Sequence, residues 1–308
     1  MSRRSILFTR RFDGVTGGHL KVSHYMQHCL AFDGIEPHLH IDPASQVEAA
    51  NNFFPSAVKR TVLPAKTDLL FVGGEDWDIL DRAGQSTGEC AVINLIQHVR
   101  HADPKSPMYK HLARPAVRVC VSQPVAEALK QSNIVNGPIV VVENGIDLEM
   151  LEARKPVRKT RQVLISGLKN PALAHEIGVI LSGWSIPHVY HTTRLPRADY
   201  LELVASSTVN LCLPDPTEGF YLPALESMAM GTGVVVPHFE GAGGYCRADE
   251  TCLVSRRTAA DLADAATALL TDPYLQAELC NNAATVLKRY SLKRERSEFH
   301  DMLRMMCE

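Results

Sequence analysis

The sequence predicts an α/β protein of two domains, each with a mainly parallel sheet covered by helices on both faces. Three observations support this prediction. Short apolar, β-prone segments alternate with amphipathic helical segments along the chain. The length of 308 residues suffices for two such domains of about 150 residues each. The charged segment 152–161 contains a proline and lacks apolar periodicity, so it is the best candidate for a linker between them.

The first half of the chain begins with an apolar strand at residues 5–9. A loop at residues 10–18 (RRFDGVTGG) and an amphipathic helix at residues 19–32 follow it. Further short apolar runs predict five more strands, at 36–41, 68–72, 91–96, 118–121 and 138–142. We therefore expect an N-terminal domain that spans residues 1–152.

The second half restarts the same alternation. Apolar runs predict strands at 162–166, 187–191, 209–213 and 234–236. Helices are predicted between and after these strands, at 172–182, 198–206, 259–271 and 274–290. We expect a C-terminal domain at residues 153–290, followed by an amphipathic, basic helix within residues 291–308.

The most informative segment is Thr208–Pro237, which predicts a strand, a loop, a short helix and a second strand. Pro223 suits the first position of a helix, and Gly231 suits its end. Glu218 lies in the loop and Glu226 lies inside the helix. Open α/β sheets bind phosphorylated ligands at such strand ends, beside a helix N-terminus. Because a carboxylate repels phosphate, we expect both glutamates to bind hydroxyl groups, and this combination indicates a nucleotide-sugar site.

Within this segment, the sequence EGFYLPALE resembles the signature of retaining GT-B glycosyltransferases of the family 4 (group 1) type. The resemblance implies a GT-B fold: two doubly wound Rossmann-like domains, an inter-domain cleft, and often a last helix that crosses back to the first domain. It implies that Glu226 binds the nucleotide ribose. It places Glu218 near the donor sugar, where its charge stabilises a developing oxocarbenium ion. Four residues would present backbone N–H groups to the donor: Gly219, Phe220, Tyr221 and Leu222.

Three further segments resemble the same family. Gly17 and Gly18 form a turn that faces the donor phosphate and the acceptor in family members, and His19 follows at the start of a helix. His98 follows the 91–96 strand, where many members place a histidine close to the donor sugar. Asn144 begins an NGID turn at the edge of the cleft. Each has a structural alternative: ordinary turns for the glycines and Asn144, and a structural role for the histidine.

Lys169 lies where the family has a GR…K phosphate clamp, but Leu168 stands where the arginine is usual. This departure matters because two cations normally offset the diphosphate charge as the leaving group departs. Arg194 and Arg197 are the candidates to replace that arginine. Leu195, between them, lies in the stretch whose backbone holds the base in family members, so the base cannot be read from side chains.

Composition limits the partners. A net charge of −2 argues against a general nucleic-acid binder, and no apolar run approaches the roughly 20 residues that cross a bilayer. Eight scattered cysteines are typical of reduced thiols in a cytoplasmic protein, with a Cys246–Cys252 disulfide as the open alternative. One set of basic residues indicates either ordinary solvated surface or peripheral contact with an anionic inner membrane face: Arg3, Arg4, Lys155, Arg158, Lys159 and Arg161.

Two short patterns resemble metal sites but are weak. Asp76-Trp77-Asp78 is a DxD tripeptide in the expected loop after the 68–72 strand, and such a motif holds a divalent metal in GT-A enzymes. His24 and His28 are four residues apart on one helix, without an obvious third ligand. We expect neither to bind metal and expect no cofactor.

The sequence thus predicts a metal-independent, retaining glycosyltransferase that moves a sugar from a nucleotide-diphosphate donor, most simply a UDP-sugar, to a saccharide or lipid-linked acceptor. Such reactions build polysaccharides and glycoconjugates. In this family Glu218 and His98 would position groups and stabilise charge, with no covalent role. Two alternatives on the same fold stay open: a nucleotide-sugar epimerase and a catalytically silent nucleotide-sugar-binding subunit.

Overall fold

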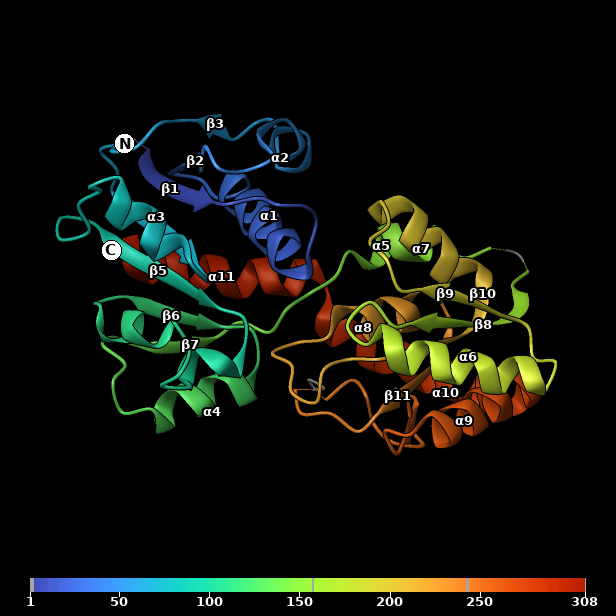
Figure 1. The fold of residues 1–308 in the computed structure, drawn as a ribbon. Coiled ribbons are helices and arrows are strands. Elements are labelled where there is room, and N and C mark those ends of the chain that lie inside the picture. The colour runs from blue at the N-terminus through green and yellow to red at the C-terminus, as the bar shows by residue number, and fades with distance from the viewer. Residues whose placement is uncertain (1–2, 157, 242–243, 308) are drawn as a thin grey trace. The chain divides into compact units, whose positions relative to one another are not determined.

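The computed structural model describes residues 3–156, 158–241 and 244–307 (Figure 1). The chain forms two compact units: residues 1–144 with 293–308, and residues 145–292. The division after Asn144 precedes the expected boundary at residue 152, because α5 (Leu148–Glu152) packs on α8 (Leu222–Ala229) of the second unit. Val157, in the expected linker, lies outside the described residues, as do residues 1, 2 and 308 at the ends of the expected domains.

The first unit has a seven-stranded parallel sheet with the strand order β3-β2-β1-β4-β5-β6-β7. Its strands are β1 (Arg4–Arg10), β2 (Ile35–Ile41), β3 (Lys59–Arg60), β4 (Leu69–Gly73), β5 (Ala91–Ile96), β6 (Val117–Cys120) and β7 (Ile139–Val141). Its helices are α1 (Gly17–Leu30), α2 (Val47–Phe53), α3 (Asp76–Arg82), α4 (Gln123–Gln131) and most of α11 (Leu292–Cys307), with 3-10 turns η1 (Val99–Ala102) and η2 (Tyr109–Ala113). Central strands are buried on both faces, as their near-continuous apolar sequences require.

The second unit has a five-stranded parallel sheet with the order β12-β11-β10-β8-β9. Its strands are β8 (Thr160–Ser166), β9 (His188–His191), β10 (Ser207–Cys212), β11 (Gly233–Pro237) and β12 (Leu253–Ser255). Its helices are α5, α6 (Pro171–Gly183), α7 (Arg197–Ser206), α8 (Leu222–Ala229), α9 (Ala259–Thr271) and α10 (Pro273–Leu287), with η3 (Lys288–Tyr290). Apolar residues of β8, β10, α6 and α9 form its core. The predicted α/β class, with two doubly wound parallel sheets, is confirmed.

Each sheet has one point at which the strand order reverses. In the first unit it lies between β1 and β4, and in the second between β8 and β10. At such a point, the loops that leave two neighbouring strands turn to opposite faces of the sheet and leave a crevice at the carboxyl ends of the strands. The loops that matter are therefore those after β1 and β4, and those after β8 and β10.

Helix α11 packs in the first unit, against α1. The Phe299 ring meets the Tyr25 ring edge-on with centroids 4.8 Å apart. The carboxylate of Glu295 forms an ion pair with Lys21 and lies 3.0 Å from Nε2 of His28. All these side chains are buried. The C-terminal helix is thus part of the first unit's core, although it follows the whole second unit in sequence.

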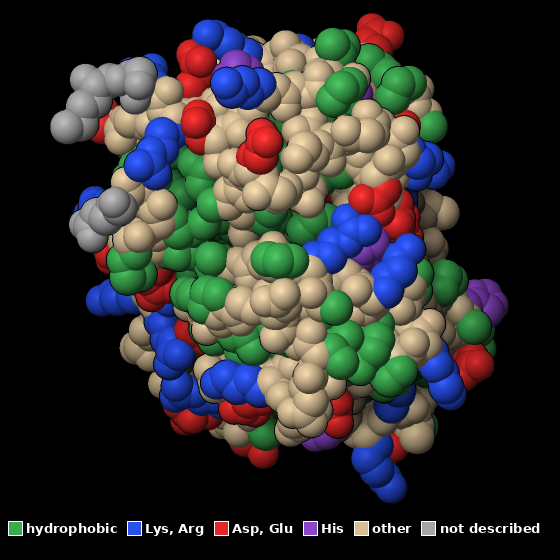
Figure 2. All heavy atoms as spheres, turned by 90° about the vertical axis from the view of Figure 1, so that its left-hand side faces the viewer, with side chains coloured by type: hydrophobic (Ala, Val, Ile, Leu, Met, Phe, Trp, Pro, Cys, Tyr) green, Lys and Arg blue, Asp and Glu red, His purple; other side chains and the backbone are tan. Residues whose placement is uncertain are grey.

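The surface carries both signs of charge. On the face drawn in Figure 2, Lys and Arg side chains are interspersed with Asp and Glu side chains. No helix in the described part of the chain has the length and apolar character that a membrane crossing needs. The eight cysteines, Cys246 and Cys252 among them, are free thiols.

Candidate functional site

The crevice of the second unit brings together two residues that are distant in sequence, Lys169 and Glu218. Lys169 follows β8, and Glu218 lies in the loop after β10, so the two strands that flank the switch point deliver them. Lys169 Nζ pairs with Glu218 Oε1 and lies 3.4 Å from Asp215 Oδ2. The Glu218 side chain is 6% exposed, whereas that of Lys169 is 40% exposed. The lysine is therefore the member of the pair that a ligand reaches first.

Hydrogen bonds to backbone groups hold the loop around Glu218 in place. Oε1 of Glu218 accepts from the N–H of Asp215 (2.9 Å), and the N–H of Glu218 donates to the carbonyl of Glu240 (2.9 Å). Gly241 lies against this loop with φ +89°, and a Cβ there would be 1.9 Å from the Glu218 carbonyl oxygen. Only glycine fits this approach, which fixes where the Glu218 carboxylate points.

Glu226 lies one turn into α8 and is almost fully buried. Its Oε1 atom accepts a hydrogen bond from Nη2 of Arg197, the first residue of α7, at 2.6 Å. The side chain of Glu226 is 2% exposed and that of Arg197 is 27% exposed, so the arginine stands between the carboxylate and solvent. Burial disfavours the guanidinium charge, but Glu226 outweighs this effect and raises the pKa of Arg197. This 2.6 Å charge-assisted bond joins a buried carboxylate to a partly exposed guanidinium and restrains both side chains.

The start of α8 is anchored by a residue that the sequence patterns do not single out, Tyr245. Its hydroxyl accepts from the N–H of Tyr221 (3.0 Å) and donates to the carbonyl of the same residue (2.8 Å). Phe220 packs on the Tyr245 ring, with centroids 5.1 Å apart, and Leu222 begins the helix. The N–H of Tyr221, which the resemblance assigns to the donor, is thus already used by a tyrosine hydroxyl in this structure. Gly219 lies in the same loop.

The candidates to replace the family arginine differ in their surroundings. Leu168, which stands at the position of the family arginine, is 41% exposed. Leu195, in the loop between β9 and α7, is 38% exposed. Arg194 is exposed in that loop. Arg197 is the one that the fold joins to a signature glutamate. A further cation, Arg257, donates to the carbonyls of Pro214 (2.7 Å) and His238 (3.2 Å), which ties the loop after β10 to the loop after β11.

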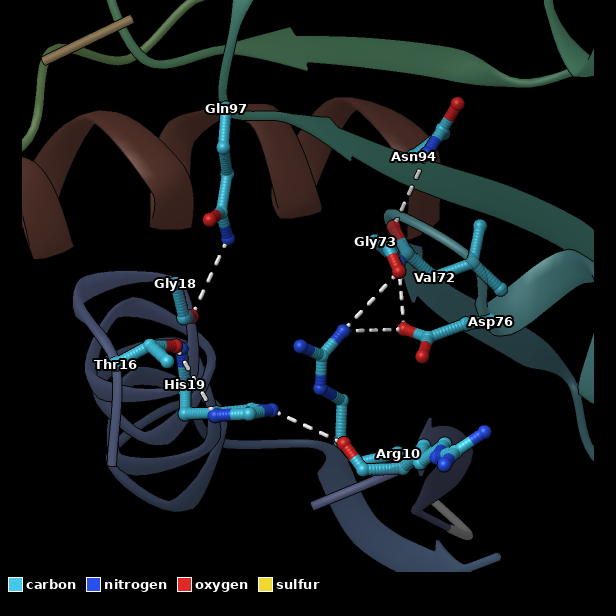
Figure 3. A network of polar contacts seen from close by, with 10 residues as sticks. Arg10, Thr16, Gly18, His19, Val72, Gly73, Asp76, Asn94 and Gln97 are labelled. Atoms are coloured by element: carbon cyan, nitrogen blue, oxygen red, sulfur yellow. Dashed lines mark hydrogen bonds and ion pairs between the residues drawn. The ribbon is translucent and has the colours of Figure 1, made fainter. Parts of the chain in front are cut away.

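The switch point of the first unit contains an ion pair between Arg10, the last residue of β1, and Asp76, the first residue of α3, which follows β4 (Figure 3). Nη1 of Arg10 donates to Oδ2 of Asp76 (2.7 Å) and to the carbonyl of Gly73 (3.1 Å). Asp76 is 3% exposed, and burial outweighs the arginine and raises the pKa of this carboxyl to about 6. The sequence patterns single out Asp76 only as part of a DxD tripeptide, and they do not connect it with Arg10.

The glycine turn lies beside this pair. Gly17 begins α1, and Nε2 of Gln97 donates to the carbonyl of Gly18 at 3.3 Å (Figure 3). A Cβ on Gly18 would lie 2.7 Å from Oε1 of Gln97, so the glutamine packs where a side chain would be. His19 lies with Nδ1 2.9 Å from the carbonyl oxygen of Gly14 and Nε2 3.0 Å from that of Arg11. Burial lowers the pKa of His19, so the neutral ring donates from one nitrogen at a time to these loop carbonyls.

His98 and Asn144 lie at other strand ends of the first unit. Nδ1 of His98 accepts from the N–H of Arg100 at 3.0 Å and caps η1, directly after β5. Asn144 is buried at the last position before the second unit, with its N–H bonded to the carbonyl of Val121 at 3.2 Å. These contacts give both residues a structural role.

The two metal-like patterns are engaged in other contacts. The DxD tripeptide begins α3 rather than lying in a loop, which corrects the expected position, and Oδ1 of Asp78 lies 3.2 Å from Nζ of Lys110. His24 and His28 both belong to the buried Lys21–Glu295 cluster. Across residues 3–156, 158–241 and 244–307 no group of three or more His, Cys, Asp or Glu residues is arranged to hold a metal ion.

The comparisons with known proteins fit this geometry. Residues 137–272 match the model of the family described as glycosyl transferases group 1. Over these residues the chain is similar to the group 1 glycosyltransferases, and the matched segment is less than half of the chain. The matched segment contains Lys169, Arg197, Glu218, Glu226 and the whole β8–α9 region. Among curated proteins, none matches the sequence.

Solved structures resemble the whole chain at low sequence identity. HepE of Anabaena, crystallised with UDP and glucose, has a TM-score of 0.74 at 13% identity and covers 98% of this chain and 100% of its own. Sucrose-phosphate synthase of Thermosynechococcus elongatus has a TM-score of 0.71 at 13% identity and covers 99% of both chains. A UDP-N-acetylglucosamine 2-epimerase has a TM-score of 0.57 at 13% identity over 91% of both chains. Likeness at this identity shows the fold, and the GT-B fold is confirmed.

Proposed function

We propose that the protein is a retaining glycosyltransferase that moves a sugar from a UDP-sugar to a saccharide or lipid-linked acceptor without a metal ion. The observation that carries this proposal is the set of four charged residues in the matched segment. Two cations, Lys169 and Arg197, and two carboxylates, Glu218 and Glu226, lie at the carboxyl ends of its strands and at the adjoining helices. Cations suit a diphosphate, and carboxylates suit the hydroxyls of ribose and sugar. The HepE structure with UDP-glucose supports uracil as the base.

The residues of this site perform three tasks in the proposed reaction. Lys169 and the N-terminus of α8 hold the diphosphate and stabilise the charge that it gains when the bond to the anomeric carbon breaks. Glu218 stabilises the positive charge that develops on the sugar ring. The acceptor oxygen attacks from the face that the phosphate leaves, and its proton passes to a phosphate oxygen, so the anomeric configuration is retained. No protein nucleophile takes part.

Two findings support independence from metal. Asp76 of the DxD tripeptide is buried in an ion pair with Arg10, and Asp78 pairs with Lys110. A divalent ion would have to displace both cations. Lys169 and Arg197 supply positive charge where a metal would otherwise act.

Thermal shifts test the donor site directly. UDP, GDP, ADP, CDP and TDP are each added with and without EDTA, to the wild type and to Glu226→Gln. A ligand at 100 times its dissociation constant stabilises by roughly 2.7 kcal/mol. We expect a shift with UDP that EDTA leaves unchanged and that Glu226→Gln abolishes, whereas the control Glu202→Gln, an exposed glutamate on α7, keeps it. A shift that requires metal, or none with any nucleotide, would contradict the proposal.

Product analysis separates the proposed reaction from its alternatives. A retaining transferase releases UDP and forms a glycoside with the donor's anomeric configuration, which proton NMR reads from the coupling constant. An epimerase yields an isomeric UDP-sugar without free UDP, and a silent subunit binds UDP-sugar without turnover. Either of these results would replace transfer as the function.

We further propose that exposed basic residues of each unit make a weak contact with an anionic membrane face. Five of the six basic residues named above are exposed: Arg3, Arg4, Lys155, Arg158 and Arg161. Lys159 is withdrawn, because its ammonium donates to Oγ1 of Thr232 (2.8 Å) and to the carbonyl of Ala205 (2.5 Å). Burial lowers the pKa of Lys159 to about 8. Absence of binding to phosphatidylserine vesicles at low salt would refute this contact.

A further inference from the structure

Both signature glutamates of the second unit are already occupied by cations. Glu218 is paired with Lys169, and Glu226 is paired with Arg197. If these carboxylates bind hydroxyls of the donor, as proposed above, the donor must take over both positions. The two cations are then released at the place where the diphosphate arrives.

Arg197 covers Glu226 more closely than Lys169 covers Glu218. The Glu226 carboxylate is 2% exposed, and its Oε1 atom is held at 2.6 Å by the guanidinium. The backbone of Arg197 cannot move far, because Tyr200 and Leu201 in the first turn of α7 are buried. The arginine side chain, 27% exposed, is therefore the part that can turn away and open the carboxylate.

The donor's charge calls for a second cation at this position. Leu168 stands where the family has an arginine, so Lys169 alone would face a diphosphate. A guanidinium binds phosphate oxygens through two parallel hydrogen bonds and keeps its charge at any physiological pH. In a nucleotide, one methylene group separates the ribose ring from the first phosphate. A side chain that is displaced from a ribose-binding carboxylate is thus already close to the phosphates.

We propose that Arg197 is the second phosphate-binding cation and that it exchanges partners when the donor binds. In the empty site it neutralises Glu226. In the complex, the ribose hydroxyls donate to Glu226, and the guanidinium turns to the diphosphate. Each charge keeps a partner throughout, so neither ion is left buried and unpaired, which would be costly. This inference rests on the proposed function and adds Arg197 to its donor-binding residues.

Binding of uridine and UDP to Arg197→Met, measured by calorimetry, tests the exchange. Uridine has the ribose but no phosphate, so the variant, with an uncovered Glu226, binds it as tightly as the wild type or more tightly. UDP loses its second cation, and its affinity falls at least tenfold. The ratio of the two dissociation constants is the readout that a merely structural role would leave unchanged. Arg161→Met, which removes an exposed arginine near the start of β8 and so at the opposite end of that strand from the site, is the control and leaves both affinities unchanged.

Each contrary result overturns the proposal. Equal weakening of uridine and UDP means that Arg197 only orients Glu226. Unchanged UDP affinity means that Arg197 does not touch phosphate. If Arg197→Met fails to fold, Arg197→Gln replaces it, because glutamine keeps an N–H donor for Glu226 and removes the charge. A wild type that binds neither uridine nor UDP refutes the proposed function itself, which is a different result from a changed ratio.

Discussion

Replacing Glu295 by glutamine should detach the C-terminal helix from the first unit. Glu295 lies on α11 with a fully buried side chain, paired with Lys21 and 3.0 Å from His28 Nε2. Glutamine keeps the size and one acceptor, but it removes the negative charge that faces the Lys21 ammonium in the interior. Removing one partner of a buried pair costs about 3–5 kcal/mol.

The pKa of Glu295 leads independently to a similar free energy for this ion pair. Burial alone would raise it, but Lys21 and then His28 lower it from 4.5 to about 2. At about 1.36 kcal/mol per pH unit, this difference corresponds to about 3 kcal/mol of stability. A depressed carboxyl pKa stabilises the fold above pH 4.5, and the contribution is lost as pH falls from 4.5 toward 2. His28 adds to the acid sensitivity, because burial lowers its pKa from 6.5 and it gains a proton on unfolding.

The assay uses the chain's two tryptophans, one in each unit. Trp77 is buried in the first unit, and Trp184 is 45% exposed in the second. In a Trp184→Phe background, urea unfolding followed by fluorescence reports the first unit alone. Glu295→Gln should lower its free energy of unfolding by about 3 kcal/mol at pH 7 and flatten the loss of stability below pH 4.5.

Two variants decide whether the ion pair is the cause. Glu298→Gln, on the same helix, removes a 39% exposed partner of Arg294 and should cost less than about 1 kcal/mol. The double variant Lys21→Met with Glu295→Met removes both charges and should recover most of the loss. A cost below about 1 kcal/mol for Glu295→Gln, or an acid transition unchanged from the wild type, would refute the reasoning.

Two further predictions concern the donor loop of the second unit. Gly241→Ala should cost about 1–2 kcal/mol of stability because alanine is strained at positive φ. The new methyl group would also lie 1.9 Å from the Glu218 carbonyl oxygen, so the loop must shift and transfer activity should fall at least tenfold. Gly84→Ala is the control, because Gly84 also has positive φ (+64°) but no atom within 4 Å of an added Cβ. It should lose a similar amount of stability and keep full activity. Equal activities of the two variants would contradict the steric argument. Tyr245→Phe leaves the N–H of Tyr221 without its hydroxyl partner, which costs about 1–3 kcal/mol and should raise the KM for the donor. An unchanged KM would show that this anchor does not position the donor loop.

Most element positions could be predicted because they depend on local patterns. The apolar run at residues 91–96 placed β5, and the helical pattern at residues 259–271 placed α9, as the structure has them. The patterns failed where local signals are weak. Glu75, the N-cap of α3, makes no side-chain capping bond, so the sequence gives no signal that a helix starts at Asp76. Strand β3 is only two residues long, which is too short for a recognisable apolar pattern.

The sequence by itself determined the α/β class, the restart of the pattern after the first domain, and the loop and helix that carry Glu218 and Glu226. Hydrophobic period, turn residues and a proline at a helix start act over a few neighbours, so they can be read along the chain. The resemblance of EGFYLPALE to a glycosyltransferase signature rests on the same local stretch.

Only the tertiary structure decided which polar groups meet. Arg197 reaches Glu226 across 29 residues, Tyr245 reaches Tyr221 across 24, and Arg10 reaches Asp76 across 66. Such pairs arise because parallel strands bring the loops at their carboxyl ends to one edge of the sheet, in an order that strand topology sets. Nothing in the spacing of these residues along the chain specifies that order, so the partners of the two glutamates could be named only from the fold.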